Sequence, residues 1–243
     1  MIVLVRRSHI GFSLLLLLTA ACMSLILGQG SGRSTAALAP AQPQQPAGRI
    51  VVVDAGHGGE DGGAVAGDGT VESGLNLEIA ARLNTLLRLM GQNTVMTRTE
   101  DVSIYSDGAQ TLHQKKVSDL ENRAALVNGL TDAVLISIHQ NSLPSSPKTR
   151  GAQVFYNGVG YAPELAAAAQ ERLNQAVNGE KGKTAKRISD SIYLTKHAQA
   201  PAVIVECGFL SNDGDTARLK EPEYQLHLAA AIAAGYFTAE DDR

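Results

Sequence analysis

Two histidines and two glutamates have the residue types and the positions needed to bind and use a zinc ion. His57 and His139 each follow a short apolar run, Glu72 precedes an amphipathic segment, and Glu206 ends a further apolar run. Two imidazoles and one carboxylate are a ligand set of open catalytic zinc sites, which keep one position for water. A second carboxylate can accept a proton from that water. We therefore expect Zn2+ on His57, Glu72 and His139, with Glu206 as the catalytic base.

Each of these residues also has a plain structural interpretation when it is taken alone. A histidine at a strand end is commonly a hydrogen-bonded residue of the core or rim, and Glu72 suits the first turn of a helix, where the helix dipole favours a carboxylate. Glu206 is harder to explain, because burying a carboxylate after the apolar residues 202–205 is costly without a partner. The joint occurrence of all four residues favours the metal site.

The apolar runs predict an α/β fold that would bring these residues together. Short runs rich in β-branched residues predict buried strands at 50–53, 133–138, 152–156 and 202–205, and a further strand at 94–97. Helical spacing and start signals predict helices at 73–90, 163–177 and 222–237, and a capping box of Ser118 and Glu121 predicts another that ends near 130. We expect a single-domain, mostly parallel twisted sheet of about six strands with helices on both faces. Functional groups of such sheets gather at the carboxyl ends of the strands.

The N-terminus predicts export. Arg6 and Arg7 precede an apolar run at 10–27, so residues 1–29 are expected to be an export signal or a signal anchor. Residues 30–48, rich in Pro, Gly, Gln and Ala, predict a flexible linker, which leaves 49–240 as the catalytic domain. We expect this domain outside the cytoplasmic membrane, secreted or anchored, with membrane contact only through the N-terminal segment if it is not cleaved.

Composition argues against several other classes of protein. A net charge of −3 gives no basis for nucleic-acid binding. Of two cysteines, Cys22 lies in the N-terminal apolar run, so the folded part has no internal disulfide and Cys207 is expected to be a packed core thiol. The glycine-rich turn at 56–59 lacks a full nucleotide-binding pattern, because Asp61 occupies the position of the third glycine.

The motifs around the four residues resemble those of zinc-dependent N-acetylmuramoyl-L-alanine amidases of the type-3 family. The resemblance rests on Asp-Ala-Gly-His-Gly-Gly at 54–59, Val-Glu-Ser at 71–73, Ser-Ile-His-Gln-Asn at 137–141 and Val-Glu-Cys-Gly-Phe-Leu-Ser-Asn at 205–212, and it covers nearly all of 49–238. Within the family the chain most resembles the germination-specific, spore-cortex members, through residues 119–123, 151–156 and 185–194. Too few residues separate Asn141 from Gly151 for the long insertion of division-type relatives.

The resemblance implies a specific reaction. A zinc hydrolase of this kind cleaves the amide bond between the lactyl group of N-acetylmuramic acid and L-alanine of the peptidoglycan stem peptide, a step towards muramic lactam in spore cortex. It implies one Zn2+ per chain on His57, Glu72 and His139, catalysis by Glu206, and a location that includes the spore intermembrane space.

Three alternatives stay open at this point. The chain could be a zinc peptidase that cuts within the stem peptide, a non-catalytic peptidoglycan-binding module, or an enzyme that depends on an activating protein partner. A basic run also has two interpretations, a solvated turn or a contact with stem-peptide carboxylates; its members are Lys181, Lys183, Lys186 and Arg187.

Overall fold

Three apolar strands form the centre of a six-stranded sheet in the computed structural model, which describes residues 48–180, 182–189 and 191–241. The sheet order is β2-β1-β3-β6-β4-β5. Its strands are β1 (Ile50–Ala55), β2 (Asn93–Met96), β3 (Ala133–Asn141), β4 (Gln153–Tyr156), β5 (Lys186–Arg187) and β6 (Ala202–Phe209). The pairing of β4 with β6 is antiparallel and the other pairings are parallel, which confirms the mostly parallel sheet.

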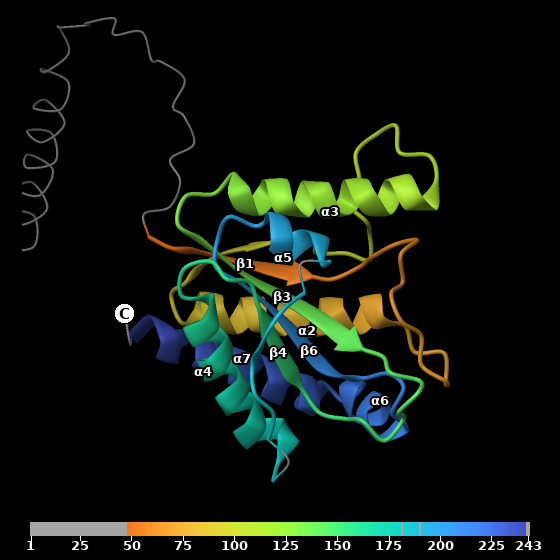
Figure 1. The fold of residues 1–243 in the computed structure, drawn as a ribbon, viewed down its shortest axis with the longest axis vertical. Coiled ribbons are helices and arrows are strands. Elements are labelled where there is room, and N and C mark those ends of the chain that lie inside the picture. The colour runs from red at the N-terminus through yellow and green to blue at the C-terminus, as the bar shows by residue number, and fades with distance from the viewer. Residues whose placement is uncertain (1–47, 181, 190, 242–243) are drawn as a thin grey trace, which may run out of the picture. The chain divides into compact units, whose positions relative to one another are not determined.

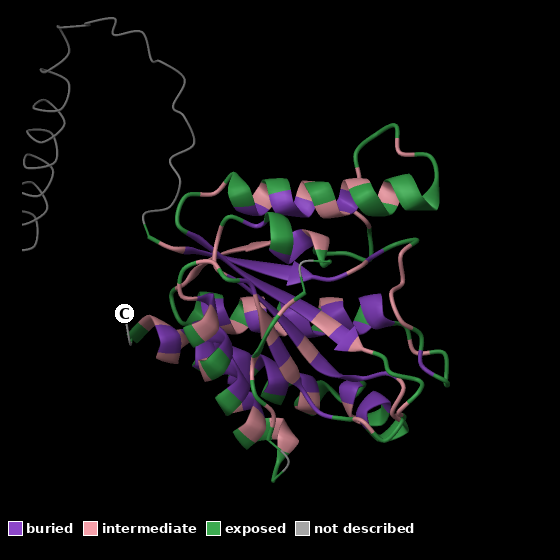
Figure 2. Cartoon of the chain, viewed as in Figure 1, coloured by how far each residue is buried: buried purple, intermediate pink, exposed green. Residues whose placement is uncertain are grey.

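Helices cover both faces of this sheet, as predicted (Figure 1). The larger core lies under α2 (Glu72–Leu89), α4 (Ala162–Leu173) and α7 (Pro222–Asp241), and the smaller one under α3 (Leu112–Asn128) and α5 (Tyr193–His197). Buried residues fill the central strands β1, β3 and β6 between the two layers (Figure 2). The chain also forms a short helix α6 (Asp213–Leu219) after β6 and a π-helical turn η1 (Asn174–Asn178) after α4.

The helix α3 begins earlier than the sequence predicts. Thr111 and Gln114 form the capping box: the Thr111 hydroxyl accepts from the Gln114 amide, and the Gln114 side chain accepts from the Thr111 amide. The predicted cap, Ser118, instead lies inside the helix and accepts a hydrogen bond from the Ser106 amide. The prediction was wrong because the same spacing pattern occurs twice, and the first copy starts the helix.

The strands β3 and β6 continue past their predicted ends. As a result His139 and Glu206 lie within these neighbouring strands, where their Cα atoms are register partners. Backbone pairing on both sides of the two side chains therefore fixes where they point.

The predicted export segment at 1–29, and the linker at 30–48 apart from Gly48, lie outside the described residues. Within the described ranges, no helix combines the length and the apolar character needed to cross a membrane.

Candidate metal and catalytic site

Two buried arginines hold the turn that carries His57. Arg123 donates to the carbonyl oxygens of Ala55 and His57, each at 2.8 Å, and Arg98 donates to those of Ala55 and Gly56 at 2.9 and 3.0 Å. His57 has a φ of 61°, in the left-handed region that residues other than glycine seldom adopt. The arginine contacts stabilise this strained backbone and so fix the position of the imidazole.

The charge of Arg123 is balanced within the core. Its side chain is 2% exposed, and the guanidinium pairs with Asp54 and with Asp119, which lies one turn earlier in α3. Burial alone would raise the pKa of Asp54, but Arg123 and a hydrogen bond from Ser137 hold it below its usual value. Thr97 donates a further hydrogen bond to Asp54 at 2.8 Å. This network links β1, β3 and α3 directly beneath the site.

The three predicted ligands converge on one point. Glu72 Oε1 lies 3.4 Å from His57 Nε2 and 3.0 Å from His139 Nδ1. One potential ligand atom from each residue lies within 4.8 Å of the others, and Glu206 does not belong to this cluster of described residues. Zinc bonds of about 2.0–2.1 Å in tetrahedral geometry place neighbouring ligand atoms about 3.3 Å apart. The residues present therefore fit a zinc ion.

Glu72 is fixed from several directions. It is the first residue of α2 and is 3% exposed, and its Oε2 accepts from the Ala64 amide at 2.8 Å. Its Oε1 accepts from the Gln140 amide at 3.0 Å and from Asn76 Nδ2 at 3.2 Å. Burial would raise the pKa of Glu72, but hydrogen bonds with the two histidines dominate and lower it. The carboxylate is thus ionised, as a metal ligand must be.

Asp61 is a part of the site that the sequence interpretation missed. Its Oδ2 lies 2.9 Å from His57 Nδ1, on the opposite side of the imidazole from Glu72, and its Oδ1 accepts from Lys116 at 3.1 Å. Burial would lower the pKa of His57, but hydrogen bonds to Asp61 and Glu72 raise it to about 9. A carboxylate on Nδ1 directs the lone pair of Nε2 towards a metal. The signal for this role was an acid four residues after the histidine.

Glu206 faces the same cavity as the two histidines. This cavity, about 360 Å³ in volume, is lined by His57, His139 and Glu206 and by Ile192 and Tyr193 near the start of α5. Among the described residues Glu206 Oε2 is buried with no hydrogen-bond partner. Burial raises the pKa of Glu206, with a smaller contribution from Glu72 in the same direction. A desolvated carboxylate beside two imidazoles has the properties of a proton acceptor.

Gly56 leaves the space that the His139 ring occupies. A Cβ atom at this position would lie 2.2 Å from the Cε1 and Nε2 atoms of the ring. The glycine of the motif is therefore required by the close approach of the backbone to the side chain of His139, a predicted ligand.

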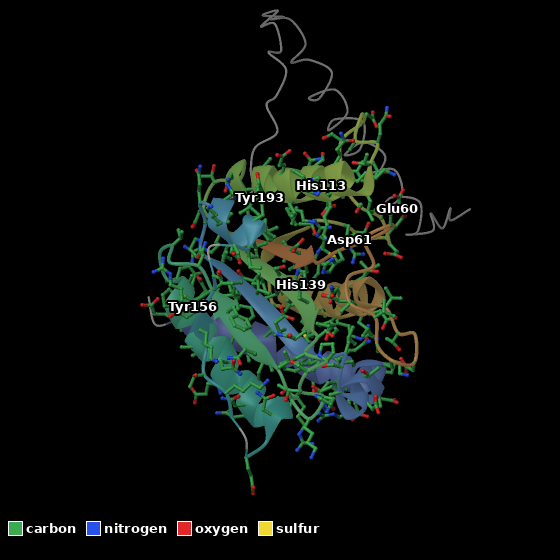
Figure 3. The ribbon with its side chains drawn as sticks, turned by 45° about the vertical axis from the view of Figure 1, so that its right-hand side comes forward. Glu60, Asp61, His113, His139, Tyr156 and Tyr193 are labelled. Atoms are coloured by element: carbon green, nitrogen blue, oxygen red, sulfur yellow. The ribbon has the colours of Figure 1, made fainter. Side chains whose placement is uncertain are left out.

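The remaining candidates lie away from the metal cluster. Cys207 is buried in the larger core, where burial raises its pKa, so the prediction of a packed thiol is confirmed. His113, His197 and His227 are exposed on helices. Figure 3 shows His113 on α3, apart from His139 on β3.

Comparison with known proteins agrees with the motifs. Residues 51–236 match the Amidase_3 family, described as N-acetylmuramoyl-L-alanine amidase. The germination-specific N-acetylmuramoyl-L-alanine amidase of Bacillus subtilis is 38% identical over 200 residues, which cover 80% of this chain and 82% of the relative.

Solved structures of amidases are also similar to this chain. The CwlD amidase of Clostridioides difficile, solved in complex with the GerS lipoprotein, has a TM-score of 0.75 and 34% identity over 80% of this chain and 99% of that one. The amidase AmiC2 of Nostoc punctiforme has a TM-score of 0.62 and 29% identity over 80% of this chain and 97% of that one.

Proposed function

Because the chain belongs to the Amidase_3 family of N-acetylmuramoyl-L-alanine amidases, we propose that it is a zinc enzyme that acts on spore-cortex peptidoglycan. The bond cleaved joins the lactyl group of N-acetylmuramic acid to L-alanine of the stem peptide, and the product leads to muramic lactam. The observation that carries the zinc assignment is the convergence of His57, Glu72 and His139 beside a buried, unpartnered Glu206 Oε2.

The proposed chemistry divides the work between the metal and the protein. Zinc held by His57, Glu72 and His139 would supply a Lewis acid that lowers the pKa of water to near ~7 and polarises the scissile carbonyl. Glu206 accepts the proton of the attacking water at Oε2. It then delivers that proton to the amine of L-alanine as the amide bond breaks. Its poor solvation favours proton uptake, because burial raises its pKa.

We assign a positioning role in the reaction to Asp61, Arg98 and Arg123. Asp61 orients the His57 ring through Nδ1, and the two arginines fix the backbone of the same turn. Rigid ligands need little rearrangement when substrate binds, which favours catalysis by preorganisation.

We further propose the domain arrangement and the location. Residues 1–29 would direct export or anchor the chain, residues 30–48 would link it to the catalytic domain at 49–240, and that domain would act outside the cytoplasmic membrane or in the spore intermembrane space. A protein partner is also proposed, supported by the structural likeness to an amidase solved with a lipoprotein.

The test is digestion of purified cortex peptidoglycan by the metal-free protein, with and without added zinc, followed by mass analysis. We expect zinc-dependent release of stem peptides with a free L-alanine amine, together with glycan whose muramic acid has lost its peptide. Vegetative peptidoglycan serves as the comparison substrate, and cortex is expected to be cleaved faster.

Other products would support other functions. Fragments cut inside the stem peptide would identify a peptidase. Binding to peptidoglycan without any zinc-dependent cleavage would identify a binding module.

A further inference from the structure

A second cavity lies beside the sheet end that carries Glu206, and it is lined by basic side chains. It has a volume of about 480 Å³ and lies between the segment 148–151, the turn η1 and the residues Lys183 and Arg218. Four of its lining residues are cations, Lys148, Arg150, Lys183 and Arg218. This cavity is separate from the metal site, because none of its lining residues lines the cavity of Glu206.

Of the four cations of this cavity, only Arg218 forms a salt bridge within the described residues. Arg218 pairs with Asp215 at 2.6 Å, and Asp215 Oδ2 also accepts from the amides of Gly151 and Phe209. No described carboxylate forms a salt bridge with Lys148, Arg150 or Lys183. Three cations therefore line one cavity without an ion pair, and Asp215, whose charge also acts on Lys183, is already bonded to Arg218 and to two backbone amides.

Lys183 is held in place and still has hydrogen-bonding capacity. Its Nζ donates to the Gly151 carbonyl at 2.6 Å and lies 4.6 Å from the centre of the Phe209 ring. An ammonium has three donors, so this position leaves donors for a ligand. Burial lowers the pKa of Lys183, which shows the cost of holding this cation away from water.

The turn η1, which forms one wall of the cavity, is held by hydrogen bonds from asparagine side chains to the backbone. The Asn178 side chain accepts from the Ala152 amide at 2.7 Å and donates to the Ala152 carbonyl at 2.9 Å. The Asn174 side chain likewise accepts from the Lys183 amide and donates to its carbonyl. Both asparagines belong to η1, and π-helical turns of this kind occur frequently at functional sites. The cavity is thus a fixed feature of the fold.

The cavity lies within reach of the scissile bond. Gln153 of β4 is the register partner of Glu206 in β6, and its side chain donates to the carbonyl of Thr184, the residue after Lys183. Adjacent strands and one side chain separate the two sites, a distance on the order of 10–15 Å, or about two to three extended residues plus the side chain of the last one. Acidic residues that follow L-alanine in a stem peptide fall in this range.

We propose that this cavity binds carboxylates of the stem peptide, at the second or third residue, and so selects substrates with free acids. The proposal rests on the proposed amidase function and deepens it. For Lys183 it selects the second of the two interpretations of the basic run, because Lys183 lines the cavity whereas Lys186 and Arg187 form β5; Lys181 lies outside the described residues.

The test compares two synthetic N-acetylmuramoyl tripeptides, one with free carboxylates at the second and third residues and one with both amidated. We expect the zinc-loaded full-length protein to show a KM about tenfold lower for the free acid, since a hydrogen bond to a charged group has about this effect. Arg150→Gln and Lys183→Met should remove most of the difference with kcat within about twofold. Arg150 is exposed, so its variant tests the proposal even if Lys183→Met folds poorly.

The matched control is Arg88→Gln, which removes an exposed cation at the end of α2. It should preserve the preference for the free acid. Equal KM values for the two substrates in the wild type, or an equal rise for both in the variants, would overturn the proposal.

Calorimetry with the free-acid N-acetylmuramoyl tripeptide separates failure of this proposal from failure of the amidase function. If neither substrate is hydrolysed, the amidase assignment fails, and binding alone then decides the role of the cavity. Binding to the wild type that both variants weaken about tenfold supports the proposal. Absent binding, or binding that the variants leave unchanged, contradicts it.

Discussion

Asp61 offers a way to weaken the proposed metal site without removing a proposed ligand. Its Oδ2 lies 2.9 Å from His57 Nδ1, and the Asp61 side chain is only 19% exposed, so water replaces it poorly. Loss of such a partner of a metal-bound histidine typically costs 10–100-fold in metal affinity. We expect Asp61→Ala to weaken zinc binding by about that factor, or about 1.4–2.7 kcal/mol. Asp61→Asn should have a smaller effect, because its amide oxygen can still accept from Nδ1.

The assay is competition for zinc against a chromogenic chelator, with circular dichroism to check the fold. The matched control is Lys116→Gln, which removes the other partner of Asp61 and leaves the contact with His57. The Lys116 side chain is 51% exposed, so loss of its ion pair with Asp61 should cost less than about 1 kcal/mol of free energy. Affinity of Asp61→Ala within threefold of wild type, or an equal loss in Lys116→Gln, would refute this role of Asp61.

Three further predictions concern the packing and charge around the site. Gly56→Ala should abolish tight zinc binding, because the added Cβ would overlap the ring of His139. Gly74→Ala, at a position of α2 with open space around it, should retain tight zinc binding. Competition with a chelator measures the zinc affinity of both variants. Arg123→Met should destabilise the protein by ~3–5 kcal/mol in urea unfolding, since it leaves Asp54 buried without its cation. In EDTA, Glu206→Gln should have a higher Tm than the wild type, and the difference should grow as pH rises above 4.5. The reason is that Glu206 has a raised pKa in the folded protein, so folding disfavours its ionised form. Equal Tm values of the two proteins across pH would contradict this.

The central strands, though not where each one ends, could be predicted because burial on both faces requires continuous apolar runs. The apolar runs before His139 and before Glu206 therefore located two residues of the site and placed them at the same end of the sheet. Glu72 was placed correctly at the start of a helix for an independent reason, the preference for acids in a first turn. These patterns are local, so the sequence carries them directly.

Other parts of the site depend on contacts between distant segments. Arg123 contacts the carbonyl of His57 across 66 residues, and periodicity in α3 gives no indication of that contact. In the sequence, Asp61 is notable only for occupying the position of the third glycine of a nucleotide-binding turn, and only the folded turn shows that it contacts His57. The strand β5 has two residues, too few for a recognisable pattern, although it sets the position of the chain after Lys183.

We propose that three side chains hold zinc while Glu206 acts as the base. The most direct test measures zinc content and cleavage of an N-acetylmuramoyl peptide in one preparation of Glu206→Gln. We expect about one zinc per chain, as in the wild type, with hydrolysis reduced by roughly 10²–10⁴-fold. Loss of zinc in this variant would identify Glu206 as a ligand, and retention of both zinc and cleavage would show that the base lies elsewhere.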